Sequence, residues 1–231
     1  MALATAAWAS DRFVGTGVDG VAVANWQTVS SLATAGGTLV LAVATFSAVR
    51  SSNRSARVAE ESLLAGLRPL LIPSLAGDPV HKALWGDRHA ARVEGGRAVV
   101  EQEGDVIYLA LGLRNVGSGI ALIHGWLVMA HQPFDDRPHA EPEVFRRQGI
   151  DLYVPAGGTG YWESAIREAD DPMRSLLEKA AANREPFRVD LLYGDQQGIQ
   201  RTISRFIVVP ADNFWYCQAA RHWNLDRPDP R

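Results

Sequence analysis

The 30 residues from 20 to 49 carry no charged side chain, and no other stretch of the 231-residue chain is neutral for as long. Crossing about 30 Å of hydrocarbon as a helix takes about 20 mostly apolar residues. With Trp26 as an interfacial anchor, the segment 26–49 would reach roughly 36 Å at about 1.5 Å per residue. Backbone groups in lipid must bond within their own segment, which requires a helix. We predict a transmembrane helix over 26–49 after an N-terminal tail over 1–25.

Two other interpretations of this neutral segment are open. One is the buried helix of a soluble protein, because several Ser and Thr side chains dilute the apolar run. Such a helix normally carries a charged face, however. The other is a cleaved signal peptide, since Ala42-Val43-Ala44 has the small-x-small form of a cleavage site. That leader would be long, and it holds Asp11 and Asp19 against Arg12 alone. The composition favours a retained span.

Positive charge is unevenly distributed about the predicted span. The N-terminal side holds Arg12 alone. The C-terminal side holds four arginines within about 20 residues, a spacing that counts for orientation: Arg50, Arg54, Arg57 and Arg68. Excess basic residues mark the cytoplasmic side of a membrane protein, where anionic lipids attract them. We therefore predict a single-pass protein of the cell membrane, with its N-terminus outside and its C-terminal domain in the cytoplasm.

Small side chains recur every four residues along the predicted span, at Ser30, Thr34, Thr38 and Ala42. Ridges of this kind let two membrane helices approach closely. The lipid bilayer is therefore the first partner that we predict. Self-association of the chain through its transmembrane helix is a second.

The helical pattern continues past the span over 50–68, which predicts a juxtamembrane helix. Pro69 disfavours helical backbone at the residue before it, so this helix should end at Arg68. A single helix running through both segments would be far longer than an average globular helix. That length is typical of a span with a cytoplasmic extension.

After Pro69 the hydrophobic period changes from helical to alternating. An alternating run over 105–114, a glycine-containing turn over 115–119 and a second apolar run over 120–129 predict a hairpin. A second hairpin is predicted over 187–209. Shorter strands are predicted at 70–73, 98–102, 151–154, 160–166 and 214–219. Such strands, many of them antiparallel, indicate a β-sandwich over 69–231.

One helix interrupts the predicted strands. Asp171 can cap it, and Pro172 suits its first position. The helix should end near Asn183 and Arg184. The predicted fold class is thus mainly β: an N-terminal transmembrane helix and stalk followed by an antiparallel β-sandwich with one inserted helix.

Composition excludes several classes of function. A net charge of −3 argues against a protein that grips nucleic acid by its phosphates. The one cysteine, Cys217, excludes an internal disulfide and a multi-cysteine zinc or iron–sulfur site. Arg greatly outnumbers Lys, and the chain is rich in Ala, Gly and Val. This bias is typical of a high-GC bacterium and does not by itself indicate recognition by arginine.

Catalytic motifs are weak or missing in the sequence. Gly117-Ser118-Gly119 joins two strands instead of leading from a strand into a helix, so a hairpin turn explains it better than a dinucleotide site. No G-x-S-x-G nucleophile elbow occurs. Cys217 follows an aromatic run and is interpreted as a small buried hydrophobic residue. His124 is interpreted as a packed histidine. We predict no catalytic residues and no cofactor.

The loop over 131–143 is the one candidate metal site. It holds imidazole and carboxylate groups at His131, Asp135, Asp136, His139, Glu141 and Glu143. Such groups can hold a divalent ion, although neither HxxxH nor EF-hand spacing is present. Three prolines suit a solvated loop instead. No metal ligand is assigned, and a metal-dependent enzyme or hydrolase using this loop is kept as the alternative function.

Two further motifs carry a resemblance. Arg68-Pro69-Leu70-Leu71 has the form R-P-x-L, and Leu113 to Ala121 has the form L-x-N-x-G-x-G-x-A. With the span and the Arg-rich stalk, this layout resembles uncharacterised bacterial single-pass membrane proteins with a C-terminal β-sandwich-like domain. The resemblance implies the fold and brings no activity. The expected function is a membrane-tethered cytoplasmic binding or interaction module, with an unknown protein partner and no nucleic acid.

Overall fold

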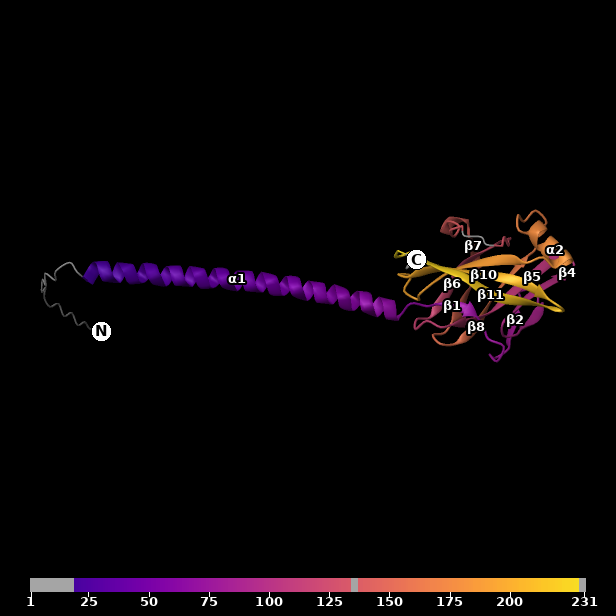
Figure 1. The fold of residues 1–231 in the computed structure, drawn as a ribbon, viewed down its shortest axis with the longest axis horizontal. Coiled ribbons are helices and arrows are strands. Elements are labelled where there is room, and N and C mark those ends of the chain that lie inside the picture. The colour runs from indigo at the N-terminus through magenta and orange to yellow at the C-terminus, as the bar shows by residue number, and fades with distance from the viewer. Residues whose placement is uncertain (1–18, 134–136, 229–231) are drawn as a thin grey trace, which may run out of the picture. The chain divides into compact units, whose positions relative to one another are not determined.

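The computed structural model describes residues 19–133 and 137–228. It divides the chain into two compact units, one ending at Ala59 and the other beginning at Glu60. Helix α1 (Asp19–Gly66) supplies the first unit and continues into the second (Figure 1). It ends two residues before the predicted end at Arg68, and Pro69 follows. The helix therefore gives the long N-terminal element that the neutral sequence predicts.

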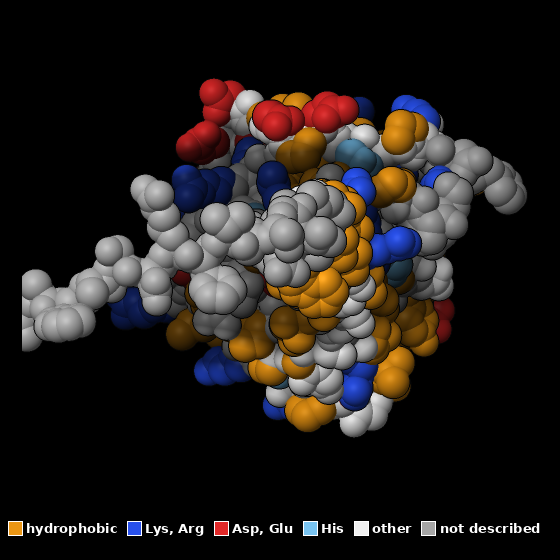
Figure 2. Space-filling view, turned by 90° about the vertical axis from the view of Figure 1, so that its left-hand side faces the viewer, with side chains coloured by type: hydrophobic (Ala, Val, Ile, Leu, Met, Phe, Trp, Pro, Cys, Tyr) orange, Lys and Arg blue, Asp and Glu red, His pale blue; other side chains and the backbone are white. Residues whose placement is uncertain are grey.

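Within α1, the segment Thr28–Leu64 is long and apolar enough to cross a membrane. Its large side chains, such as Leu39, Val40 and Phe46, are exposed. Figure 2, which looks from the N-terminal side, shows hydrophobic side chains in orange on the surface beside the grey residues. This exposure does not fit the buried helix of a soluble protein, which would be covered on its apolar side.

Three threonine hydroxyls in the neutral part of α1 are satisfied by the helix itself. Thr34 Oγ1 donates to Ser30 O, Thr38 Oγ1 to Thr34 O and Thr45 Oγ1 to Leu41 O, each over 2.8 Å. Polar groups in lipid must be bonded internally. The threonines that dilute the apolar run are therefore compatible with a hydrocarbon environment.

The second unit is built on one nine-stranded antiparallel sheet. Its strands are β1 (Leu71–Pro73), β4 (Arg97–Glu103), β5 (Val106–Asn115), β6 (Ala121–Ala130), β7 (Arg146–Val154), β8 (Thr159–Ile166), β9 (Phe187–Gly194), β10 (Arg201–Ala211) and β11 (Phe214–Asn224). Their order is β1-β5-β4-β11-β10-β9-β6-β7, and β8 pairs with the other side of β5. A separate hairpin consists of β2 (His81–Leu84) and β3 (Ala90–Val93).

The sheet curls around its main core, which takes buried side chains from nearly every strand. Trp126 of β6 and Trp162 of β8 meet edge to face, with ring centroids 5.5 Å apart, although these strands are not neighbours in the sheet. Helix α2 (Arg174–Asn183) lies beside β4 and β5 (Figure 1). A short 3-10 turn, η1 (Pro142–Val144), precedes β7.

The predicted fold class is confirmed: the chain is mainly β and antiparallel, with a long N-terminal apolar helix and one inserted helix. Some details differ. The predicted hairpin over 105–129 does not form: β5 pairs with β1, β4 and β8, and β6 pairs with β7 and β9, so the glycine turn joins two strands that are not partners. The β2–β3 hairpin was not predicted, and β7 and β11 are longer than expected. Asp171 is not the cap of α2, because the helix begins later, after Met173. The Asp171 carboxylate instead accepts the Met173 N–H over 2.9 Å, just ahead of the helix.

The two sequence motifs meet in space around the buried Asn115 side chain. Its Oδ1 accepts the N–H groups of Leu70 (3.1 Å) and Gly117 (3.0 Å). Its Nδ2 donates to the carbonyls of Gly119 (2.7 Å) and Val154 (3.1 Å). One amide therefore joins the start of the domain, the β5–β6 turn and the end of β7.

Glycine is needed in the β5–β6 turn because the linker, the segment 67–70 between α1 and β1, packs directly against it. A Cβ at Gly117 would overlap the Arg68 carbonyl, and one at Gly119 would overlap the Leu67 carbonyl. Arg68 is in turn held by a salt bridge to Asp226 and by Asn224 Oδ1 at 3.0 Å. The glycines of the motif thus allow the chain to enter the sheet at β1.

A buried ion pair lies in the middle of the β9–β10 ladder. Asp190 and Arg205 face each other, and both Nε and Nη2 of Arg205 lie 3.0 Å from the carboxylate. Arg205 also donates to the Arg137 carbonyl over 3.2 Å and stacks 4.6 Å from the Trp223 ring centroid. Trp223 is only 6% exposed. Trp223, near the end of β11, therefore packs this part of the strand onto the ion pair.

Glu163 on β8 is a buried acid with an unusual environment. It is 5% exposed, and its Oε2 has no hydrogen-bond partner among the described residues. Burial raises the pKa of its carboxyl group, against a smaller opposite effect of the Leu84 N–H. The folded state therefore keeps this proton to a higher pH than the unfolded chain does. The free energy of unfolding should fall as pH rises from about 4.5 through the raised folded pKa.

Replacing Glu163 with Gln should remove this decline. We expect Glu163→Gln to stabilise the domain at pH 7.5 by about 1 kcal/mol relative to wild type, because an unpaired buried charge is lost. No gain is expected at pH 4. Urea unfolding of the full chain in a neutral detergent, followed by tryptophan fluorescence, measures the difference. The exposed Glu143→Gln is the control, and parallel pH profiles of Glu163→Gln and wild type would contradict the prediction.

Candidate functional site

A β-bulge interrupts β6 at His124. Ile123 pairs with Tyr193 of β9 and Gly125 with Leu192, so His124 has no partner of its own. On the other edge of β6 the register with β7 shifts at the same point. A bulge bends the strand and redirects a side chain, and such irregularities occur preferentially beside binding sites.

Gly125 lets the bulge close against the start of β7. A Cβ at this position would lie 3.0 Å from the Arg146 carbonyl and 3.2 Å from the Phe145 Cβ. Gly194 has a similar role on β9, since a Cβ there would lie 3.0 Å from Nε2 of His124. The two glycines thus make room for the imidazole at the sheet surface.

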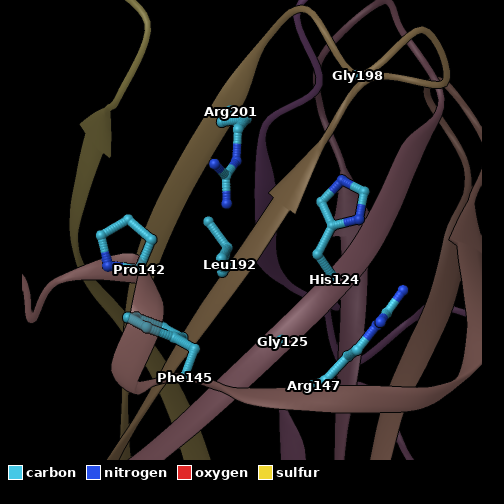
Figure 3. A pocket seen from close by; sticks show the side chains of 8 residues that line it. All are labelled: His124, Gly125, Pro142, Phe145, Arg147, Leu192, Gly198 and Arg201. Carbon is cyan, nitrogen blue, oxygen red and sulfur yellow. The ribbon is translucent and has the colours of Figure 1, made fainter.

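The redirected imidazole lines a pocket of about 460 Å³, which we call the bulge pocket. Its lining residues come from β6, β7, β9, β10, the β9–β10 turn and the segment around η1: His124, Gly125, Pro142, Phe145, Arg147, Leu192, Gly198 and Arg201. Figure 3 shows the imidazole between the Arg201 and Arg147 side chains. The volume lies within the range of roughly 300–1,000 Å³ that is usual for small-molecule sites.

The apolar wall of the bulge pocket is rigid. Phe145 and Leu192 are buried and belong to a small core cluster with Ile203 and Trp223. Pro142 adds a third apolar surface. A ligand in this pocket would therefore meet a fixed hydrophobic surface on one side and basic side chains on the other.

His124 is uncharged at neutral pH. Burial lowers the pKa of its imidazole, and the positive charge of Arg201 lowers it further, against opposite effects of Asp151 and Asp195. The Asp195 carboxylate is itself engaged, because it accepts the Gln200 N–H over 3.0 Å. No hydrogen bond joins the imidazole to any residue in the part of the chain that the structure describes. It therefore offers one N–H donor and one acceptor to a ligand.

Arg147 and Arg201 differ from the arginines of the domain that form salt bridges, such as Arg146, Arg174 and Arg205. Neither guanidinium has a carboxylate within salt-bridge distance among residues 19–133 and 137–228. Arg146, next to Arg147, shows the contrast: it lies 2.6 Å from the Asp171 carboxylate and stacks on the Trp126 ring. Neighbouring residues of a strand point to opposite faces. Arg146 is thus part of the fold, while Arg147 faces the bulge pocket.

The described residues of the candidate metal loop over 131–143 do not form a metal site. Asp135 and Asp136 lie outside the described residues. Within residues 19–133 and 137–228, no group of three or more His, Cys, Asp or Glu side chains could hold a metal ion. His139 Nδ1 lies 2.8 Å from the Ala140 carbonyl, and its ring meets Trp223 edge-on.

The other residues considered in the sequence as candidate functional groups lie in a turn, in the core and at the β6 bulge. Gly117 and Gly119 lie in the turn between β5 and β6, which is not a hairpin because these strands do not pair. Cys217 is buried in the core. His124 is half-buried at a bulge, a placement that the interpretation as a packed histidine did not include. Arg147 and Arg201 were not singled out. The signal in the sequence was the His124-Gly125 pair, which breaks the alternation of a strand.

Comparisons with known proteins add no further constraint. No protein-family model, no curated protein and no solved structure matches the chain.

Proposed function

We propose that this chain is a membrane-tethered binding module whose ligand site is the bulge pocket. A single span over 26–49 holds it in the cell membrane, with the N-terminus outside and the β domain in the cytoplasm. The observation that carries the proposal is the pair Arg147 and Arg201, two guanidinium groups without a carboxylate in the described structure that face one pocket. Such a pair is suited to holding an anion.

The tether is supported by α1. Its segment Thr28–Leu64 is long and apolar enough to cross a membrane, and three of its threonine hydroxyls are bonded within the helix. The arginines that follow the span at Arg50, Arg54 and Arg57 support the cytoplasmic placement of the domain.

The chemistry of the pocket supports binding over catalysis. A catalytic base is normally held in place by a third group that accepts its second N–H. In the described structure His124 has no such hydrogen bond. Cys217, the one thiol, is 5% exposed and far from reactive, because burial raises its pKa.

Because the native thiol of Cys217 is buried, cysteines introduced elsewhere can be labelled selectively in a topology experiment. Ser10→Cys places a single reactive thiol in the N-terminal tail, and Asn213→Cys places one in the exposed β10–β11 turn. A membrane-impermeant maleimide should label Ser10→Cys in intact cells and Asn213→Cys only after permeabilisation. Wild type should stay unlabelled in both. The reverse pattern, or recovery of the full chain in a detergent-free soluble fraction, would contradict the proposed tether.

A further inference from the structure

We propose that the bulge pocket recognises a phosphomonoester, with the phosphate held between Arg147 and Arg201 and capped by the His124 N–H, and the organic part against Phe145 and Leu192. This inference rests on the proposed binding function and names the chemical class of its ligand. It follows from the number and placement of the donors, the charge of the site and the size of the pocket.

The donors fit a phosphate better than a carboxylate. Arg147 and Arg201 come from different strands, β7 and β10, and His124 comes from β6 between them (Figure 3). One guanidinium fork already satisfies both oxygens of a carboxylate. A phosphomonoester has three terminal oxygens, so each of the three side chains can donate to its own oxygen.

The charge of the site fits as well. A phosphomonoester carries about −1.5 to −2 charges at pH 7. The two guanidinium groups supply two positive charges beside a neutral imidazole, and the Asp151 and Asp195 carboxylates near His124 partly offset them. On the other side of Arg201 a second hollow is lined by Glu141, Glu143 and Asp226. Of these, Asp226 is paired with Arg68, and the carboxylates of Glu141 and Glu143 disfavour an anion in that hollow.

The pocket is too large for a free phosphate ion alone. Its volume of about 460 Å³ leaves room for an organic group, and Phe145, Leu192 and Pro142 give that group an apolar surface. The phosphate could belong to a soluble metabolite or to the headgroup of a lipid such as phosphatidic acid. Both sources offer the same terminal oxygens to the arginines.

Calorimetric titration of the full chain in nanodiscs of phosphatidylcholine tests the inference, with phenyl phosphate as the probe. Phenyl phosphate should bind, and phenyl sulfate and benzoate should bind at least about 10-fold more weakly because each carries one charge. Arg147→Ala and Arg201→Ala should each weaken the binding of phenyl phosphate about 10- to 100-fold, the usual range for losing a charge-assisted contact. Arg92→Ala, which removes an exposed arginine on β3, is the matched control and should bind like wild type.

The source of the phosphate is assigned by a competition arm. If nanodiscs containing phosphatidic acid abolish the binding of phenyl phosphate, the headgroup is the ligand; if they do not, the ligand is soluble. Both outcomes support the phosphate chemistry of the pocket.

Three results would overturn the inference. Equal binding of benzoate or phenyl sulfate would leave an anion-binding module without the proposed selectivity. Binding that is unchanged in Arg147→Ala and Arg201→Ala would place the site elsewhere. Absence of any phenyl phosphate binding would reject the phosphate ligand, while the maleimide experiment still decides the tether independently.

Discussion

Asn115→Ala should lower the free energy of unfolding of the β domain by about 3–5 kcal/mol, since buried groups that lose their hydrogen bonds each cost about 1–3 kcal/mol. The Asn115 amide makes four hydrogen bonds, to Leu70, Gly117, Gly119 and Val154. Alanine leaves all four backbone groups without this partner. For a domain of this size the loss corresponds to roughly 6–20 °C in Tm.

Two further variants make this prediction specific. Asn115→Asp keeps the oxygen that accepts the Leu70 and Gly117 N–H groups and loses the two donated bonds, so its loss should be intermediate. Asn213→Ala, in an exposed turn, should leave the melting temperature unchanged within about 1–2 °C, as expected for a surface substitution. Thermal unfolding of the full chain in neutral detergent gives all three values. An Asn115→Ala melting temperature equal to that of Asn213→Ala would show that the amide does not hold the linker.

The second large effect is expected at the buried pair of Asp190 and Arg205. Asp190→Ala should destabilise the domain by about 3–5 kcal/mol, because it leaves a buried guanidinium without its carboxylate. Water cannot replace the lost carboxylate, because Arg205 is buried within the β9–β10 ladder and under Trp223. Urea unfolding followed by tryptophan fluorescence measures the loss.

A double variant separates the lost partner from the lost packing. Asp190→Leu combined with Arg205→Met replaces the pair with apolar groups of similar volume, and should recover most of the stability that Asp190→Ala loses. The exposed pair of Glu94 and Arg97 is the control, and Glu94→Ala should cost at most about 1 kcal/mol. A double variant as unstable as Asp190→Ala would show that the charges themselves stabilise the fold.

Much of the architecture was predictable, because local patterns carry it. The alternation over 105–114 and the apolar run after the glycine turn predicted the strands β5 and β6 but not their partners, since the two strands do not pair with each other. The neutral run predicted α1. The β2–β3 hairpin lacked such signals. Its strands are four residues long, and its turn places Arg88 at positive φ instead of a glycine. A short strand with exposed alternate residues resembles a loop in sequence.

The candidate site was not predictable for a different reason. Whether an arginine is a structural group or a ligand-binding one depends on its tertiary partners. Arg146 and Arg147 are adjacent and chemically identical, yet one pairs with Asp171 and the other faces the bulge pocket. In the sequence, the excess of arginine over lysine is explained by the composition typical of a high-GC bacterium, which does not distinguish one arginine from another. The bulge at His124 follows from pairing on both edges of β6, which no local pattern specifies.

The way the chain enters the β domain has a mechanical consequence. Any tension that reaches the domain from a membrane anchor arrives at its N-terminal end, where β1 pairs antiparallel with β5 through Leu71, Ile72 and Pro73. The load falls first on the contacts of Arg68 with Asp226 and Asn224, and then on these few ladder bonds and the Asn115 amide, before it reaches the tryptophans of the core. Under force, the domain should therefore yield first by peeling off its first strand, with the rest of the sheet still closed.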